Sequence, residues 1–305
     1  MPAAQLRFVT GKGGVGKTTV AAALALHAAR GGRRVLLVET AADRSLAALF
    51  GGAALGVEPA VLDGTLSAVR IEQKALVESY FRRLLRLPFL ARRLFASNTF
   101  QAVTAAAPGV IEFVVLEHLL QWTEPGRFTR RAAYDAVIVD GPASGHAVRW
   151  LRTPRQLARL VPAGPIAASI GRLQTLLDDH RRTRVTLVAI PDEMAVAELL
   201  ETRAALAPAG VALTAPVLNR TWPKRFSAAD GRVIAARPAD EPLVAAARLA
   251  IAARREADRH LARLKQETGA AAVALAERPG VPIDAEELAA MGGELAPLLE
   301  GGRGA

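Results

Sequence analysis

Cysteine is absent from this chain of 305 residues. Its absence excludes a disulfide framework, a thiolate zinc site, an iron–sulfur cluster and a cysteine nucleophile. Aromatic residues make up only 5% of the sequence, so few side chains could stack on single-stranded bases. No apolar run reaches the roughly 18 residues that span a bilayer, and the N-terminus lacks the pattern of a signal peptide. We therefore expect a soluble, cytoplasmic protein without direct membrane insertion.

Lysine is also scarce, because arginine supplies most of the basic residues behind the net charge of +10. Such a charge raises the question of nucleic-acid binding. The basic residues are spread along the chain, however, and form only small clusters such as Arg82–Arg83. We interpret the charge as a solvated, arginine-rich surface and expect no nucleic-acid partner.

Short apolar runs alternate with helical patterns along the chain. The helix over Lys17–Arg30 is followed by Gly31–Gly32, a natural helix stop. This alternation predicts an α/β fold: a doubly wound, mostly parallel sheet in one domain that spans residues 1–305. The predicted strands are Leu6–Thr10, Val35–Glu39, Leu66–Ile71, Ala136–Asp140, Arg184–Ile190, Val211–Leu218 and Ala271–Ala276.

Residues 72–124 interrupt this alternation, because they contain no convincing strand. Helices are predicted there at Glu72–Arg86, Phe89–Ala105 and Pro108–Trp122. We interpret residues 72–124 as an inserted helical subdomain and residues 165–182 as a small second helical insert. Leucines and phenylalanines alternate with arginines in the first insert, which favours amphipathic helices packed on the sheet over a client-binding groove.

Loops and one further helix complete the prediction. Residues rich in proline and glycine predict spacers at Gly51–Gly64, Pro223–Pro242 and Arg278–Pro282. A helical pattern covers Glu241–Glu267.

A phosphate-binding loop follows the first strand and opens the first long helix. The pattern G-x-x-x-x-G-K-[ST] is met by Gly11, Gly16, Lys17 and Thr18. Glycines let backbone N–H groups surround a phosphate, and the helix N-terminus favours negative charge. Lys17 would neutralise the β- and γ-phosphates, and the Thr18 hydroxyl would bind Mg²⁺. The predicted nucleotide-binding residues of this loop are Gly11, Gly13, Gly14, Val15, Gly16, Lys17, Thr18 and Thr19.

Lys12 narrows the choice among phosphate-loop families, because a lysine directly after the first glycine is the deviant Walker A signature. The stretch KGGVGKTT resembles that of the nucleotide-dependent dimerising ATPases, among them the chromosome-partition, septum-site, arsenite-pump and tail-anchored-protein-targeting ATPases. In these proteins the signature lysine reaches the partner's nucleotide across a homodimer interface. The resemblance therefore implies that Lys12 acts in trans and Lys17 in cis.

The segment from Asp140 to His146 follows a buried strand. An aspartate at that position, beside a phosphate loop, is well placed to bind Mg²⁺ through water. Thr18 would bind the same ion directly. The segment resembles the DTAPTGH switch of the arsenite-pump and protein-targeting ATPases, and residues 146–154 resemble the continuation of that switch. His146 would sense the γ-phosphate or hold the loop; as an alternative it is a capping or packed residue.

Three other segments resemble the same family. Residues 66–72 resemble the strand that leads into its helical region, and Pro108–Glu112 resembles the start of a helix there. Val217–Arg220 with Pro223 resembles the adenine-binding segment, which implies that the Asn219 amide pairs with the adenine edge. ATP and Mg²⁺ are the cofactors that the resemblance implies.

The first switch departs from the family. Aligned without a gap, the aspartate that positions the attacking water falls on Ala41, which has no side-chain oxygen. Either Asp43 or Glu39 reaches the site by a different path, or hydrolysis is slow. We hypothesise that Asp43 substitutes. The predicted catalytic residues are Lys12, Lys17, Asp43 and Asp140.

The resemblance implies a cytoplasmic ATPase in which Mg-ATP closes a homodimer and so drives binding or release of a partner protein. The sequence does not identify that client or membrane-associated partner. Because cysteine is absent, neither a cysteine-held zinc at the dimer interface nor thiol binding of a metalloid is possible. One alternative, motivated by Ala41, is a nucleotide-gated scaffold with little turnover. Another, motivated by the charge, is a DNA-partition ATPase.

Overall fold

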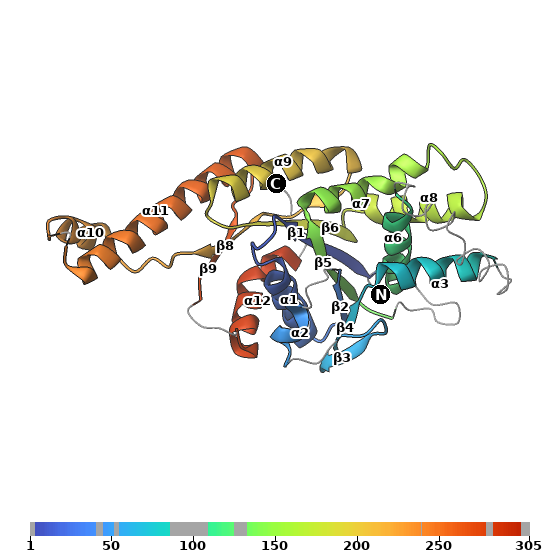
Figure 1. Cartoon of the computed structure of the whole chain (residues 1–305), viewed down its shortest axis with the longest axis horizontal. Helices are drawn as coiled ribbons and strands as arrows, with labels where there is room; N and C mark the ends of the chain where they lie inside the picture. Colours follow the sequence, from blue (N-terminus) through green and yellow to red (C-terminus); the bar gives the residue numbers. More distant parts are fainter. Residues whose placement is uncertain are drawn as a thin grey trace.

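The computed structural model describes residues 4–40, 45–51, 55–85, 109–124, 133–238, 240–278 and 283–299. In this part of the chain nine strands form one sheet, in the order β3-β4-β2-β5-β1-β6-β8-β9, with β7 paired to β6 (Figure 1). Only the β3–β4 pair is antiparallel. The strands are β1 Gln5–Gly11, β2 Val35–Glu39, β3 Ala60–Asp63, β4 Leu66–Arg70, β5 Ala136–Ala143, β6 Thr183–Ala189, β7 Ala212–Leu213, β8 Val217–Thr221 and β9 Val273–Ala276.

Helices cover both faces of this sheet, which explains why most side chains of its central strands are apolar and buried. On one face lie α1 and α12, and on the other lie α6, α7, α8 and α9 (Figure 1). The α/β class and the mostly parallel sheet are therefore confirmed. The helices are α1 Lys17–Arg30, α2 Ser45–Leu49, α3 Gln73–Leu85, α6 Val110–Thr123, α7 Ser144–Leu157, α8 Pro165–Asp178, α9 Glu193–Leu206, α10 Ala228–Ala235, α11 Pro242–Thr268 and α12 Ala285–Leu299.

Helix α1 lies between the sheet and α12, and small residues make this position possible. Most of its side chains are alanines, and the residues from Val20 to Leu26 are all buried. Gly292 of α12 lies so close that a Cβ atom there would be 2.6 Å from the carbonyl oxygen of Ala23. Close packing of α12 holds the helix that begins at the phosphate loop.

Three loop or strand predictions are wrong. Residues 60–63, predicted within a spacer, form the edge strand β3, which turns back at Gly64 to pair with β4. The predicted strand Val211–Leu218 is divided into β7 and β8, because Pro216 lacks the N–H that a continuous ladder needs. The predicted spacer Pro223–Pro242 contains α10, which begins with a capping box between Ser227 and Asp230.

The helical inserts are described in part. Helices α3 and α6 occupy the predicted positions and contact each other, whereas the predicted helix Phe89–Ala105 lies outside the described residues. Helix α8 fills the second predicted insert. Whether these segments form separate subdomains stays a prediction.

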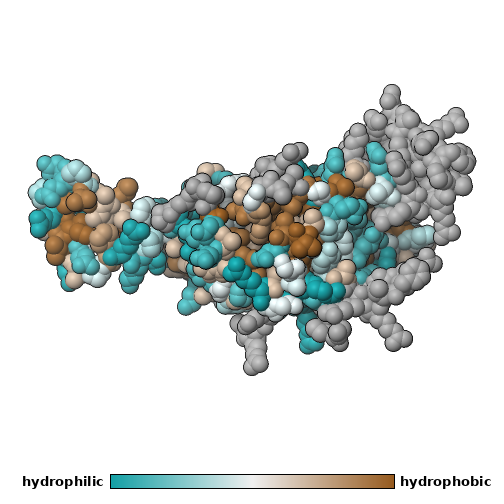
Figure 2. Space-filling view, turned by 90° about the horizontal axis from the view of Figure 1, so that it is seen from below, coloured by the Kyte–Doolittle hydropathy of each residue, from teal (hydrophilic) through white to brown (hydrophobic). Residues whose placement is uncertain are grey.

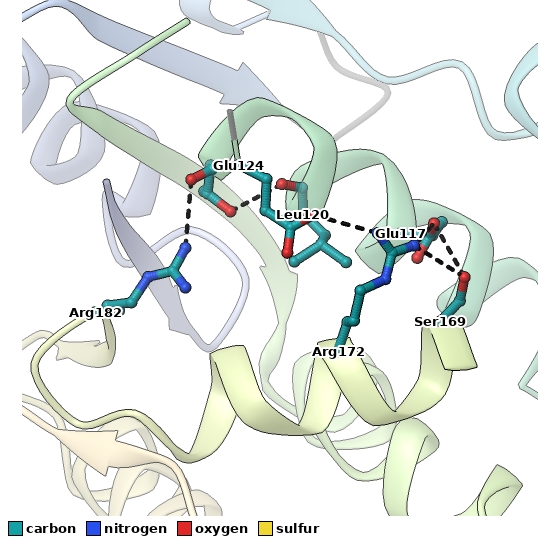
Figure 3. A network of polar contacts seen from close by, with 7 residues as sticks. Glu117, Leu120, Glu124, Ser169, Arg172 and Arg182 are labelled. Atoms are coloured by element: carbon teal, nitrogen blue, oxygen red, sulfur yellow. Dashed lines mark hydrogen bonds and ion pairs between the residues drawn. The ribbon is translucent and has the colours of Figure 1, made fainter. Parts of the chain in front are cut away.

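Polar contacts fasten α8 to α6 (Figure 3). The Arg172 guanidinium lies 3.3 Å from a carboxylate oxygen of Glu117 and 3.4 Å from one of Glu124. The Ser169 hydroxyl also donates to Glu117, at 3.3 Å. The second insert is therefore tied to a helix of the first.

Helices α10 and α11 form an arm that extends from the body of the molecule (Figure 1). Helix α11 has 27 residues, about 40 Å of helix. Its C-terminal half packs on the body through Ala257, His260 and Leu264. Hydrophobic residues gather at the far end of the arm (Figure 2). Leu243, near the start of α11, is 85% exposed. Among the described residues, no helix is long and apolar enough to cross a membrane.

Candidate functional site

The phosphate loop joins the end of β1 to the start of α1, as predicted from the sequence. Two of its glycines are required by their surroundings. A Cβ atom on Gly11 would overlap the carbonyl oxygen of Val188 on β6, and Gly16 precedes α1 with a φ of 90°. The Lys17 ammonium donates to the Lys12 carbonyl oxygen at 3.1 Å, so it lies over the loop. Gly13 and Gly14 are exposed, and a Cβ atom on either would meet open space, where a phosphate would be surrounded by backbone N–H groups.

Thr18 and Asp140 meet beside this loop. The Thr18 hydroxyl donates to Asp140 Oδ2 at 2.7 Å, although the two residues lie on α1 and β5. Asp140 is buried and lies in register between Val9 of β1 and Glu39 of β2. A hydroxyl and a carboxylate side by side are hard oxygen donors, so this pair fits Mg²⁺ with bound phosphate.

Two threonines position the loop after Asp140. The Thr10 hydroxyl donates to the Pro142 carbonyl oxygen at 2.7 Å, and the Thr40 hydroxyl donates to the Asp140 carbonyl oxygen at 2.6 Å. The ends of β1, β2 and β5 are therefore held together at the carboxyl edge of the sheet. Ligands of open α/β sheets bind at this edge.

A cavity of about 320 Å³ opens next to the loop. Asn219 borders it, and its Nδ2 donates to the Val15 carbonyl oxygen at 2.9 Å. The structure thus brings Asn219 to the phosphate loop, with its amide nitrogen bound to the loop itself. The described lining residues are Gly16, Thr19, Ala48, Leu49, Asn219, Arg220, Ala276, Glu277, Arg278, Ile283 and Met291.

Several of these lining residues were not predicted from the sequence. Arg220 is the one non-glycine residue with positive φ, 56°, in the described part of the chain, and its Nε lies 3.9 Å from Glu277 Oε2. Arg220 belongs to the segment that resembles the adenine-binding segment, but no role was predicted for it. Met291 and Leu49 come from α12 and α2, which no local motif connects to the phosphate loop.

Asp43 and Glu39 are the two candidates for positioning the attacking water. Asp43 and Ala41 lie outside the described residues. The Glu39 carboxylate is buried: Oε1 accepts from the Leu46 backbone N–H at 3.0 Å, and Oε2 lies 4.0 Å from Arg70 Nε. Glu39 is therefore engaged in holding α2 and β4.

His146 and Lys12 are the remaining candidates. His146 lies exposed in the first turn of α7, with Nδ1 3.2 Å from an Arg149 nitrogen, so it packs on its own helix. The Lys12 side chain is half-buried and forms no ion pair with any residue that the structure describes. An action of Lys12 on a second subunit stays a prediction.

A family model of the anion-transporting ATPases matches residues 4–163, which include the phosphate loop and Asp140. The chain belongs to this family. Family membership supports ATP binding and an ATPase activity in general, in agreement with the resemblance of its motifs.

Its relatives include ATPases with different names. The ATPase BagA of Mycobacterium tuberculosis is 30% identical over 231 residues, 74% of this chain and 68% of the relative. An arsenical pump-driving ATPase of Escherichia coli is 30% identical over 241 residues, 73% of this chain and 40% of that protein. The ATPase get3 of Aspergillus terreus is 29% identical over 155 residues, 50% and 44% of the two chains. The matches thus cover less than half of the last two relatives.

Proposed function

We propose that this chain binds Mg-ATP in the cavity beside the phosphate loop and transfers the γ-phosphoryl group to water. The observation that carries the proposal is the 2.7 Å contact between the Thr18 hydroxyl and Asp140, next to Lys17. When bound, Mg²⁺ would neutralise the negative charge that develops on the phosphates. Thr18 would hold it directly, and Asp140 through water.

The remaining groups position the reactants. Lys17 would leave the Lys12 carbonyl oxygen to reach the β- and γ-phosphates, and the loop N–H groups would hold the β-phosphate. Asp43 is the proposed water-positioning residue, because the Glu39 carboxylate is already engaged with Leu46 and Arg70. Catalysis of this kind relies on positioning and charge stabilisation rather than on a covalent intermediate.

Nucleotide binding would act as a switch between two copies of the chain. Lys12 of one subunit would contact the phosphates of the other, and closure of this homodimer would change the binding of a cytoplasmic client or a membrane-associated partner protein. With alanine at position 41, slow turnover is the second candidate: a nucleotide-gated binding protein with the same site. Measured turnover separates the two.

Calorimetric titration with ATP, with and without Mg²⁺, tests the binding step. We expect Mg²⁺ to tighten binding in the natural chain and to have little effect in Asp140→Asn. Lys17→Ala should weaken binding by about tenfold or more. Lys265→Ala, at an exposed position in the last turn of α11, serves as a lysine-to-alanine control and should bind as the natural chain does. Equal ATP binding by Lys17→Ala and the control would contradict the proposed site.

Sizing and turnover test the switch. Mg-ATP should shift the chain from monomer to dimer, and Lys12→Ala should lose the shift while it still binds ATP. Asp43→Ala should lower turnover about 100-fold or more. A chain that stays monomeric with Mg-ATP excludes the trans role of Lys12. Unchanged turnover in Asp43→Ala excludes Asp43 as the residue that positions the attacking water.

A further inference from the structure

A second cavity, of about 300 Å³, lies at the carboxyl end of β4, where α3 and α6 meet. Among the described residues, none lines both this cavity and the nucleotide cavity. The described residues that line it are Val57, Glu58, Pro59, Arg70, Ile71, Glu72, Ala75, Leu76, Ser79, His118 and Trp122.

Negative charge dominates this second cavity, in a chain whose net charge is +10. Glu58 and Glu72 are exposed carboxylates in its wall. Its one guanidinium, that of Arg70, lies 4.0 Å from the buried carboxylate of Glu39 and is offset by it. Neither the Glu58 nor the Glu72 carboxylate forms an ion pair with a residue that the structure describes, so a cation would be attracted into the cavity and an anion repelled from it.

Aromatic and apolar groups form the rest of the wall. The rings of His118 and Trp122 pack edge to face, with centroids 4.5 Å apart, and the indole is half-buried. Ile71 and Leu76 add an apolar surface. A guanidinium or ammonium group on an apolar stem matches all three features: its charge pairs with the carboxylates, it can contact the indole ring, and its stem covers the aliphatic wall.

One buried carboxylate connects this cavity to the nucleotide cavity. Glu39 is 1% exposed; its Oε2 lies 4.0 Å from Arg70 in the second cavity, and its Oε1 accepts from the Leu46 backbone N–H at 3.0 Å. Leu46 belongs to α2, and two later residues of α2, Ala48 and Leu49, line the nucleotide cavity. A displacement of Arg70 therefore acts on both ends of the Glu39 carboxylate.

We propose that the second cavity is a regulatory site for a guanidinium or ammonium group, and that its occupation strengthens ATP binding through Arg70, Glu39 and α2. The bound cation repels Arg70 toward Glu39, which steadies that carboxylate and the α2 residues beside the nucleotide. The proposal rests on ATP binding at the phosphate loop. By linkage, ATP strengthens binding of the cation by the same factor.

Calorimetry with defined probes tests the site before any nucleotide is added, so its outcome is independent of the proposed function. The cationic probe is Nα-acetyl-arginine amide, and the neutral counterpart is Nα-acetyl-citrulline amide, which has nearly the same shape. We expect only the arginine probe to bind, and Glu72→Gln to weaken it by about fivefold or more. Glu201→Gln, an exposed carboxylate on α9, is the matched control and should bind as the natural chain does. Equal binding of both probes, or no effect of Glu72→Gln, overturns the site.

The coupling is measured as the ATP dissociation constant with and without saturating arginine probe. We expect the arginine probe to lower the ATP dissociation constant several-fold in the natural chain and in Arg70→Lys, which keeps the charge. In Arg70→Gln the arginine probe should lower it no more than the neutral citrulline probe does. Probe binding without any change in ATP affinity overturns the regulatory role. The last comparison uses a peptide with the same arginine between leucines. If this peptide binds about tenfold more tightly than the arginine probe, a partner protein is the source of the cation. If the two bind with equal affinity, the source is a free small molecule.

Discussion

Arg149 Nε lies 2.8 Å from Glu112 Oε1, and this contact joins two sequence motifs that are distant along the chain. Glu112 lies in the first turn of α6. Arg149 lies on α7, which follows the Asp140 segment. The same junction contains Thr153, whose methyl group would be 3.3 Å from a Cβ atom on Gly109. The helix that follows the proposed magnesium residue is therefore docked directly on α6.

Removing Arg149 tests this junction. The Glu112 side chain is only 11% exposed, so Arg149→Met would leave its charge buried. We expect the free energy of unfolding to fall by about 1–3 kcal/mol. Adding Glu112→Gln should recover part of the loss, with a coupling energy of at least about 0.5 kcal/mol. Urea denaturation measures the four proteins of the cycle. Arg159→Met, at an exposed position past the end of α7, is the control; a loss equal to that of Arg149→Met would show that the ion pair contributes nothing specific.

Asn219 should set the preference for ATP over GTP. Its Nδ2 is committed to the Val15 carbonyl oxygen, so Oδ1 is the group left for a base. An acceptor suits the exocyclic amino group of adenine and repels the corresponding oxygen of guanine. We expect Asn219→Ala to reduce the ratio of ATP to GTP affinity by about tenfold.

Asn219→Asp distinguishes preference from affinity. It keeps an acceptor but loses the donor to Val15, so both nucleotides should bind more weakly while the ATP preference persists. Competition titrations with a fluorescent nucleotide measure the ATP and GTP affinities of the natural chain and of both variants. If the ratio in Asn219→Ala equals that of the natural chain, Asn219 does not read the base.

The sequence predicts the fold and the phosphate loop well, because both depend on local patterns. A continuous run such as Val35–Glu39 predicts a strand buried on both faces, and the structure has the same bounds. The sequence signal of the phosphate loop lies almost entirely in nine consecutive residues. The predicted position of the loop between β1 and α1 is confirmed.

Long-range features could not be predicted, because they depend on which segments the sheet brings together. Met291 reaches the nucleotide cavity only because α12 packs on α1. Glu39 looked like a candidate for water positioning from its place at a strand end, yet its carboxylate holds Leu46 and Arg70. Edge strand β3 was missed because four mostly exposed residues show no apolar pattern.

Arg7 is a buried cation whose removal should stabilise the protein. It lies in β1 at 2% exposure, and its Nε and Nη2 have no hydrogen-bond partner in the described part of the chain. Burial, followed by the charges of Arg184 and Arg33, lowers the pKa of Arg7 to about 10. Its one acceptor, the Arg182 carbonyl oxygen, also accepts from the Leu6 N–H, so Arg7→Met leaves that oxygen paired. We expect Arg7→Met to raise the free energy of unfolding at pH 7 by about 1–3 kcal/mol.

The pH dependence of this gain follows from the pKa. Below pH 10 both folded and unfolded states keep the Arg7 proton, so the natural chain carries the full penalty. Above pH 10 the folded state loses the proton first, the unfolded state binds more protons, and the stability of the natural chain rises relative to Arg7→Met. Urea denaturation at pH 7 and pH 10.5 should show the difference between the two proteins shrink. A variant that is less stable than the natural chain at pH 7 would mean that Arg7 packs more favourably than its charge costs.

Two adjacent glycines of α12 should respond in opposite directions to the same substitution. A Cβ atom on Gly292 would lie 2.6 Å from the Ala23 carbonyl oxygen and 2.8 Å from the His27 Cβ, both on α1. Gly292→Ala must therefore push α12 away from α1, and we expect a loss of about 1–3 kcal/mol in the free energy of unfolding. A Cβ atom on Gly293 meets nothing within 4 Å, so Gly293→Ala should gain up to about 1 kcal/mol from helix propensity alone.

The same pair tests whether α12 shapes the nucleotide cavity. Met291 precedes Gly292 and lines that cavity, so displacement of α12 should move it and weaken ATP binding several-fold in Gly292→Ala. Gly293→Ala, with the same added methyl group on the exposed side, should bind ATP as the natural chain does. Thermal unfolding and calorimetric ATP titration of both variants provide the two measurements. If Gly292→Ala loses stability but keeps full ATP affinity, α12 supports α1 without determining the shape of the cavity.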